Sequence, residues 1–507
     1  MDKTGRVSTA TRPRHAAHRA SPREAWWWLP FLALLGVATL VAGSLAALGL
    51  EHHHGVTTVG DEVHYLIGAI ALGRFGTLQV SSATHWAVAH QLFPHMTSNE
   101  LLRHVLPTGY QVHAPGIPLL LALPVLGGVT VARVSWIVVL AIGIVVVSII
   151  AARSLGRRTA WPMALVALIA TPATFLAMTQ IYPDLPAGAI IAALWLVIWR
   201  LETGWQPPGW ALVSAGVSVG ALVLLHSKNL VPAALLTAAL VVVAVKRGVA
   251  RRTLPLFAAG ILPLAIVWLV TSLIAFHPGV LPRSGLGGLD VRSLTGILGL
   301  LVDAQQGLLV QQPWVVLGVA GIIVMARRAP WSTAALVGSL VIVLGANGSL
   351  MNTYGGTSMV GRFGWELLVP LAAGGALFLV KLREHRRGAA IVVLGAALAL
   401  ALIQGIVLVT LSHHAFFNHV VLPGHWQQGR AYGWWPGASF LPVLDAMHLR
   451  GAWQHAATWW SVGLVLSVAV AAIAGLLWLL EPRRWPRLTS LAAVGVAVVC
   501  IVGRALS

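Results

Sequence analysis

The feature that most constrains this chain is a succession of apolar runs, each about 20 residues long, separated by short basic clusters. A run of that length crosses the roughly 30 Å hydrocarbon core of a bilayer as an α-helix. Hydrophobic residues make up 58% of the 507-residue sequence and charged residues only 9%, against roughly 25% in soluble globular domains. No water-soluble fold hides that much apolar surface. The sequence therefore predicts an all-α polytopic membrane protein.

The net charge of +19 is typical of nucleic-acid-binding proteins, but that function needs basic residues gathered on one face. Here Lys and Arg fall between the apolar runs, in clusters such as 153–158, 246–252 and 381–387. About two thirds of them lie in such clusters, which the positive-inside rule places in the cytoplasm. We therefore expect a lipid bilayer around the chain and no nucleic-acid partner.

Between these basic markers we place about 13 membrane-spanning helices, with the N-terminus cytoplasmic and the C-terminus outside. Residues 1–28 are predicted to form a basic cytoplasmic tail before an uncleaved signal anchor. The segment 115–128 is apolar, but a crossing there would put the next basic cluster outside, so we expect an interfacial helix instead. The predicted spans are residues 29–50, 131–152, 160–180, 186–200, 210–227, 229–245, 254–276, 306–325, 331–350, 363–380, 389–411, 458–480 and 488–503.

Three predicted exoplasmic stretches are long enough to carry a function, namely 51–130, 277–305 and 412–457. The chain has only 14 Asp and Glu residues, so each can be assigned to a side of the membrane. Those without basic neighbours fall on the exoplasmic side or its border, and none lies in the middle of a predicted span. This pattern argues against a proton- or sodium-coupled transporter, whose coupling carboxylates lie near the midplane.

The first acidic motif is residues 60–66, Gly-Asp-Glu-Val-His-Tyr-Leu, soon after the first span. If a helix begins here, Asp61 and His64 share one face, while Glu62 points about 100° away. Asp61 then either faces a cleft or caps an interfacial helix. Both readings leave Asp61 at the start of the large first exoplasmic loop.

Two further motifs place a charge beside prolines or within apolar sequence. Asp184 follows Tyr182 and Pro183 in a short turn, where it is either held at the membrane surface or simply forms the turn. Lys228 interrupts a long apolar stretch, so it either snorkels to the surface or pairs with an anion. We favour an anion site because snorkelling leaves the neighbouring His226 without a role.

The remaining polar motifs lie nearer the middle of the chain. A glycine-rich segment containing Tyr354 leads to Arg362, whose planar guanidinium suits a phosphate; a plain turn with a snorkelling Arg is the alternative. Asp303 and Gln306, with Arg292 upstream, add a polar group of residues on the same predicted side.

The 20 histidines show no metal-binding spacing, and the single cysteine, Cys500, excludes an internal disulfide and a Cys-based metal site. His113 is notable because it faces the same predicted compartment as Asp61. The sequence contains no GxSxG elbow, P-loop or Rossmann fingerprint, which excludes an ATP-driven machine within this chain.

Taken in order, these motifs resemble those of the glycosyltransferase C superfamily. The resemblance rests on an acidic pair early in a large first exoplasmic loop, a Pro-containing interfacial helix, a Tyr-Pro-Asp turn after the third helix and about 13 spans. It is greatest to the branch with the protein O-mannosyltransferases and the lipid A aminoarabinose transferase. The similarity covers residues 29–380, a predicted catalytic module, and leaves 381–507 as further helices with an exoplasmic loop.

The resemblance implies inverting transfer of a sugar from a polyprenyl-phosphate donor to an envelope glycan, lipid or protein on the exoplasmic face of the plasma (inner) membrane. Asp61 would be the general base, with Glu62 as the alternative, and Asp184 a second catalytic carboxylate. Lys228, Arg362 and Arg292 would bind the donor phosphate. The predicted substrate-binding residues are His64, His113, Tyr182, His226, Asp303, Gln306 and Tyr354.

No cofactor is required in this scheme, although a divalent metal is compatible with it, and we expect a monomer. The alternative function is a lipid-linked-sugar transporter or flippase, which would bind the same lipid phosphate without transferase chemistry. A flippase needs a polar path through the midplane, whereas the predicted polar groups gather on one side.

Overall fold

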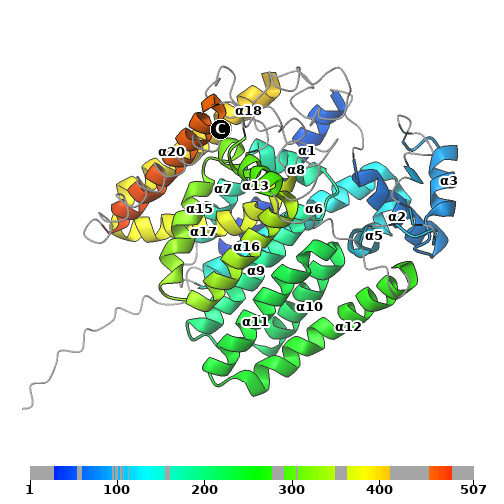
Figure 1. Ribbon diagram of the computed structural model, residues 1–507, viewed down its shortest axis with the longest axis horizontal. Coiled ribbons are helices and arrows are strands. Elements are labelled where there is room, and N and C mark those ends of the chain that lie inside the picture. The colour runs from blue at the N-terminus through cyan, green and yellow to red at the C-terminus, as the bar shows by residue number, and fades with distance from the viewer. Residues whose placement is uncertain are drawn as a thin grey trace, which may run out of the picture.

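The computed structural model describes residues 28–53, 60–93, 96, 101–102, 105–106, 108–111, 113–154, 160–276, 291–303, 307–348, 362–410 and 456–481. Their secondary structure is helical (Figure 1), apart from isolated bridges that pair Gln79 with Tyr110 and Val105 with Gln111. The helices are α1 (Trp28–His53), α2 (Glu62–Phe75), α3 (Ser81–Ala89), α5 (Gly116–Leu121), η1 (Pro124–Gly127), α6 (Val129–Ser154), α7 (Ala160–Ile169), α8 (Pro172–Thr179), α9 (Asp184–Glu202), α10 (Gly209–Leu225), η2 (Ser227–Asn229), α11 (Leu230–Lys246), α12 (Ala250–Phe276), α13 (Val291–Val302), α14 (Leu308–Gln311), α15 (Val315–Ala326), α16 (Pro330–Gly348), η3 (Arg362–Gly364), α17 (Trp365–His385), α18 (Arg387–Thr410) and α20 (Ala456–Leu480).

Within the described residues, nine helices are long and apolar enough to cross a membrane. The shorter apolar helices α10 and α15 pack among them. The predicted all-α polytopic class is therefore confirmed. The last predicted span, 488–503, lies outside the described residues, so the total of 13 stays a prediction.

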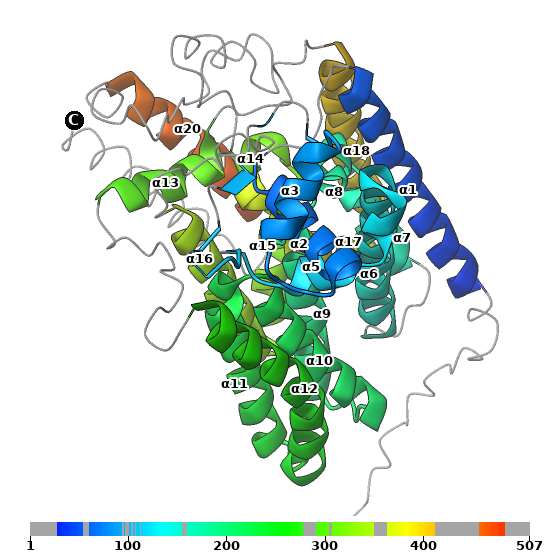
Figure 2. The same cartoon turned by 90° about the vertical axis from the view of Figure 1, so that its right-hand side faces the viewer.

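Helix α17 is the centre of the bundle and packs against α7, α9, α15 and α18. All 18 residues of its most apolar stretch are buried. Helix α12 is the opposite case, because only 11% of the residues in its most apolar stretch are buried. It leans along the outside of α10 (Figures 1 and 2), where Gly216 and Gly260 let the two backbones meet. An apolar helix with so exposed a surface is suited to lipid.

Two predicted spans, 160–180 and 306–325, are each interrupted in the structure. The first breaks into α7 and α8 because Pro172 lacks an N–H and the Thr171 hydroxyl accepts the Thr174 N–H at 3.3 Å. The second breaks into α14 and α15 at Gln312, whose side-chain amide donates to the Thr171 hydroxyl at 2.9 Å. The side chains at the two breaks are thus hydrogen-bonded to each other.

The first of the predicted exoplasmic stretches forms a separate group of short helices, α2, α3, α5 and η1, at one side of the bundle (Figures 1 and 2). The single helix expected over 115–128 is two short ones, since Pro124 begins η1 after the end of α5. Leu119, Leu120 and Leu123 are exposed on it.

Helix α9 connects two chemically different ends of the bundle, about 28 Å apart for its 19 residues. At its last turn, the Glu202 carboxylate accepts the N–H groups of Trp331 and Ser332, at 3.1 and 2.9 Å, and so caps α16. The Lys246 ammonium lies 4.1 Å from the centre of the Trp331 ring. At its first turn lies Asp184, in the candidate site.

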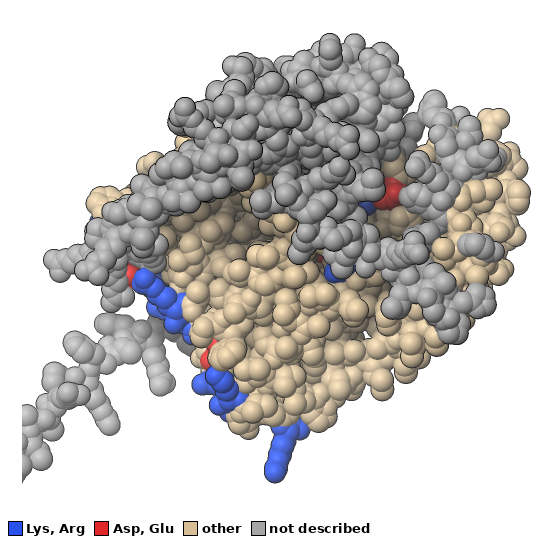
Figure 3. All heavy atoms as spheres, in the orientation of Figure 1, with Lys and Arg blue, Asp and Glu red and all other residues tan. Residues whose placement is uncertain are grey.

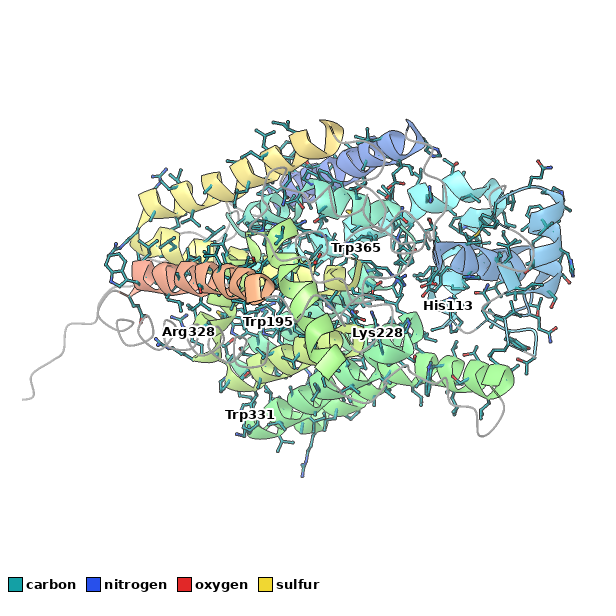
Figure 4. All side chains as sticks on the ribbon, turned by 45° about the horizontal axis from the view of Figure 1, so that its top comes forward. His113, Trp195, Lys228, Arg328, Trp331 and Trp365 are labelled. Atoms are coloured by element: carbon teal, nitrogen blue, oxygen red, sulfur yellow. The ribbon has the colours of Figure 1, made fainter. Side chains whose placement is uncertain are left out.

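Basic side chains gather at the end of the bundle that contains Glu202. On the face shown in Figure 3, Lys and Arg lie along the lower left edge, while most of the described surface is uncharged. In Figure 4, Arg328 and Trp331 lie at that end, whereas Lys228 and Trp365 lie among the helices and His113 lies beyond them. The two ends therefore carry different side chains, as the charge pattern of the sequence predicts.

Candidate functional site

Five charged side chains meet at the end of the bundle away from the basic edge, and together they form what we name the ionic cluster. Each comes from the beginning of a helix or from a turn between helices: Asp61 precedes α2, Asp184 begins α9, Lys228 lies in η2, Arg362 begins η3 and Glu366 lies in the first turn of α17. They are up to about 300 residues apart in the sequence, so only the fold brings them together.

Two cations link the three carboxylates of the ionic cluster. The Arg362 guanidinium bridges two of them, with Nη1 2.9 Å from Asp61 Oδ2 and Nε 3.3 Å from Asp184 Oδ2. The Lys228 Nζ lies 2.5 Å from Asp184 Oδ1 and 3.0 Å from Glu366 Oε2. Asp184 is thus the shared member, contacted by both cations.

Exposure separates the three carboxylates. The Asp61 side chain is 26% exposed, whereas those of Asp184 and Glu366 are 1% and 0% exposed. Arg362 and Lys228 are also largely buried, at 7% and 12%. Asp61 is therefore the carboxylate of this cluster that a molecule from outside can reach.

Local structure explains why the buried carboxylates are tolerated. Asp184 and Glu366 both lie in first turns of helices, where the helix dipole favours negative charge. Gly188, one turn after Asp184, has no side chain, and this allows the Glu366 backbone to pack directly on α9. Asn347, near the end of α16, accepts from Lys228 Nζ at 3.2 Å and donates to the Phe363 carbonyl at 3.0 Å. The first turn of α17 is thereby held beside Lys228.

Aromatic rings cover the Arg362 guanidinium. Its carbon lies 3.8 Å from the centre of the Tyr182 ring, a cation–π distance. Burial raises the pKa of Tyr182 above its ordinary value, and burial likewise raises the pKa of Tyr65. Both phenols therefore stay neutral at physiological pH. Among the described residues, the buried Tyr65 hydroxyl has no hydrogen-bond partner.

A second buried ion pair lies directly beside the ionic cluster. Glu62, the neighbour of Asp61, receives two parallel hydrogen bonds from Arg133 of α6, Nε to Oε1 at 2.9 Å and Nη2 to Oε2 at 2.7 Å. Both side chains are almost fully buried. Glu51, at the end of α1, accepts from the Thr179 hydroxyl nearby. Glu62 and Asp61 therefore face different partners, as helix geometry predicts.

Three of the predicted histidines surround the ionic cluster. The His113 ring packs on His64 and on Tyr65, with ring centres 5.6 and 4.8 Å apart. His226 Nδ1 accepts the backbone N–H of Lys228 at 3.1 Å. Burial lowers the pKa of His226 to about 3, so this imidazole is neutral at physiological pH.

A pocket adjoins the cluster between the first-loop helices and α12. It encloses about 720 Å³ of space, part of which is open to solvent. His113 and His226 line it, and these two residues connect it with the cluster. Its far wall is formed by Trp268 and Ser272 of α12.

The structure decides several alternatives that the sequence left open. Asp61 makes no side-chain cap hydrogen bond to α2, so the helix-cap reading is wrong and its partner is Arg362. Lys228 and Arg362 do not snorkel, because both are buried against carboxylates. Asp184 does more than form a turn, since it contacts both cations.

Other predicted residues are placed elsewhere or not described. Asp303 is buried at the end of α13, where its carbonyl accepts the Gly307 N–H at 2.8 Å. The side chain of Arg292, together with Gln306 and Tyr354, lies outside the described residues, as do residues 412–455. No group of three His, Cys, Asp or Glu in the described ranges is arranged to hold a metal ion.

Sequence reasoning missed Glu366, Asn347 and Arg133. Arg133 could have been found, because a lone Arg inside an apolar run carries the same signal that identified Lys228. Glu366 is one of the carboxylates that the sequence places on the exoplasmic side or its border, and it follows Arg362 by one helical turn. Asn347 carries no charge and no motif, so only its contact with Lys228 identifies it.

Comparison with known proteins gives one structural likeness. No protein-family model matches the sequence, and a search of curated proteins finds no match. Among solved structures, the chain is similar to the crystal structure of ArnT from Cupriavidus metallidurans bound to undecaprenyl phosphate, with 14% identity, 95% of this chain and 77% of that chain covered, and a TM-score of 0.48.

Proposed function

We propose that this protein is a membrane glycosyltransferase that moves a sugar from a polyprenyl-phosphate donor to a cell-envelope acceptor. The observation that carries the proposal is Asp61, a partly exposed carboxylate held by Arg362 against a buried group of cations. That arrangement supplies a base on the accessible side and positive charge behind it. These are the two requirements of direct glycosyl transfer from a lipid phosphate.

Asp61 is the general base in this proposal. The acceptor hydroxyl attacks the anomeric carbon, its proton passes to the Asp61 carboxylate, and the bond from that carbon to the phosphate oxygen breaks. A single displacement of this kind inverts the anomeric centre. Glu62 is the weaker candidate, because its carboxylate is buried and both of its oxygens accept from Arg133.

Lys228 and Arg362 stabilise the leaving phosphate. Both are bound to carboxylates in the structure, so the donor phosphate takes the place of a carboxylate oxygen as their partner. Arginine has five N–H donors in a planar fork, which suits phosphate as well as carboxylate. When the phosphate engages Arg362, the Asp61 carboxylate is released toward the acceptor.

The basic edge of the bundle supports an exoplasmic location for this chemistry. The positive-inside rule puts the end with Lys246 and Arg328 in the cytoplasm. The ionic cluster lies at the other end of α9. This arrangement supports the proposal that the cluster faces the exoplasmic side of the plasma membrane.

The proposal is tested by transfer from a radiolabelled polyprenyl-phosphate sugar to envelope acceptors, with the protein in nanodiscs. Asp61→Asn should lower transfer roughly 10²–10⁴-fold, as expected for loss of a general base, and leave donor binding largely intact. Lys228→Met should instead weaken donor binding. The matched control is Glu384→Gln, an exposed carboxylate in the last turn of α17.

Undiminished transfer by Asp61→Asn would refute the base assignment. A transporter is distinguished in the same preparation. If the wild-type protein moves the labelled lipid across a vesicle membrane, transfers no sugar, and keeps that movement in Asp61→Asn, the protein is a flippase and not a transferase.

A further inference from the structure

The pocket beside the ionic cluster contains a buried amide that the proposed chemistry does not use. Gln111 lies in the segment between α3 and α5, and only 8% of it is exposed. Among the described residues, neither its side-chain oxygen nor its side-chain nitrogen has a hydrogen-bond partner. We name this cavity the Gln111 pocket; it is lined also by Tyr110, His113, His226 and Trp268.

An amide buried without partners is costly, typically about 1–3 kcal/mol for one unsatisfied group. A buried polar group that lines a pocket and lacks a protein partner is suited to a ligand. Since the amide both donates and accepts, the matching ligand carries groups that do the same. Hydroxyl groups meet that requirement, because each is at once a donor and an acceptor.

The lining of the pocket restricts the charge of that ligand. The described residues that line it include no Asp, Glu, Lys or Arg. His226 adds no charge either, because burial lowers its pKa to about 3. An ammonium or a carboxylate placed here would lose its hydration without meeting an opposite charge. Trp268 and Tyr110 offer apolar ring surface suited to the C–H face of a sugar.

We propose that the Gln111 pocket binds the ring of an uncharged sugar, with the Gln111 amide hydrogen-bonded to ring hydroxyls. The inference deepens the proposed transferase function and rests on it for the adjacent phosphate site. The ring belongs either to the donor lipid or to a glycan acceptor, and both place a neutral polyhydroxylated ring beside His226, which contacts Lys228 of the ionic cluster. The same lining disfavours a sugar bearing an ammonium or a carboxylate, because it offers neither group an Asp, Glu, Lys or Arg partner.

The experiment measures binding to the whole protein in nanodiscs. The probes are undecaprenyl phosphate alone, undecaprenyl-phosphate arabinose, its 4-amino-4-deoxyarabinose counterpart, undecaprenyl-phosphate mannose, and octyl arabinoside and octyl mannoside as phosphate-free rings. The test variant is Gln111→Leu, nearly the same size as glutamine. Its control is Gln79→Leu, the same substitution at an exposed residue. Gln79 forms an isolated β-bridge with Tyr110, which lines the pocket.

The expected result in the wild-type protein is tighter binding of at least one neutral sugar lipid, or of its octyl glycoside, than of the matching sugar-free molecule. Gln111→Leu should reduce that difference roughly tenfold, with binding of undecaprenyl phosphate alone unchanged. Loss in the lipid-linked series identifies the donor ring, and loss in the octyl series identifies the acceptor ring. Thermal stability of Gln111→Leu should be equal to or above that of the wild type, because an unsatisfied amide is removed.

Three outcomes would overturn the inference. They are an unchanged sugar preference in Gln111→Leu, no sugar preference in the wild-type protein, and binding of the ammonium-bearing lipid as tight as that of neutral arabinose. Failure of the proposed phosphate site is distinguishable from these outcomes. In that case the wild-type protein does not bind undecaprenyl phosphate alone but still binds the octyl glycosides.

Discussion

The buried pair of Arg133 and Glu62 allows a quantitative test of how the first loop is held in place. Arg133→Met removes both hydrogen bonds and leaves the Glu62 carboxylate buried without its partner. Loss of one member of such a pair costs about 3–5 kcal/mol. We therefore expect a loss within that range.

The reverse substitution should be milder. Glu62→Gln keeps the size of the side chain and one acceptor for Arg133, so we expect about 2–3 kcal/mol. Replacing both partners, Glu62→Leu with Arg133→Met, should restore much of the stability, because no unpaired charge of this pair remains. Together with the single variant Glu62→Leu, Arg133→Met and this double variant form a double-mutant cycle whose coupling energy reports the pair itself.

The assay is reversible SDS-induced unfolding in mixed micelles, from which the free energy of unfolding is obtained by linear extrapolation. The control is Arg327→Met, which breaks a pair with Glu481 of similar N–O distance, 3.2 Å, but with side chains 45% and 39% exposed. Such a surface pair contributes about 0–1 kcal/mol. If Arg133→Met costs no more than Arg327→Met, the reasoning that burial makes this pair essential is refuted.

Three further predictions use the same unfolding assay. Gly188→Val should cost about 1–3 kcal/mol, because its side chain would enter the Glu366 backbone, whereas Gly395→Val, where nothing lies within 4 Å, should cost much less; equal losses would contradict the packing. Glu202→Ala should cost about 1 kcal/mol through loss of the two N–H contacts that cap α16, and an unchanged free energy would show that the cap contributes nothing. His226 has a folded pKa of about 3 against an ordinary 6.5, so the unfolded chain binds the extra proton between these values. Its contribution to stability is complete above pH 6.5 and is lost as the pH falls toward 3, and His226→Gln should flatten that part of the profile; an unaltered profile would show that His226 titrates normally.

Much of the candidate site could be predicted because charge is scarce in this sequence. A charged residue within an apolar run is costly unless it has a partner, and this cost made Lys228, Arg362, Asp184 and Asp61 stand out. The structure places these four together. Their partners were less predictable, since the contact of Arg362 with Asp184 joins residues 178 positions apart. No local pattern records such a separation.

The interruptions of the predicted spans show the same limit. Hydropathy identifies the apolar stretch 160–180 but does not by itself locate its break at Pro172. The side chain that Thr171 contacts at this break, Gln312, is 141 residues away, and no local pattern identifies it. The central position of α17 is also invisible in its sequence. Its own composition resembles that of the other helices, and only the packing of α7, α9, α15 and α18 around it makes it fully buried.

The sequence by itself determined the class of this protein, the two chemically different ends of its helices and most of the charged residues of the site. It could do so because hydropathy and the cost of isolated charge act on each segment separately. Only the tertiary structure decided which carboxylate each cation meets, and that Asp61 is accessible while Glu62 is paired with Arg133. It also decided that Gln111 lines a pocket without a hydrogen-bond partner among the described residues. These properties depend on contacts between distant segments, and such contacts exist only once the helices have packed.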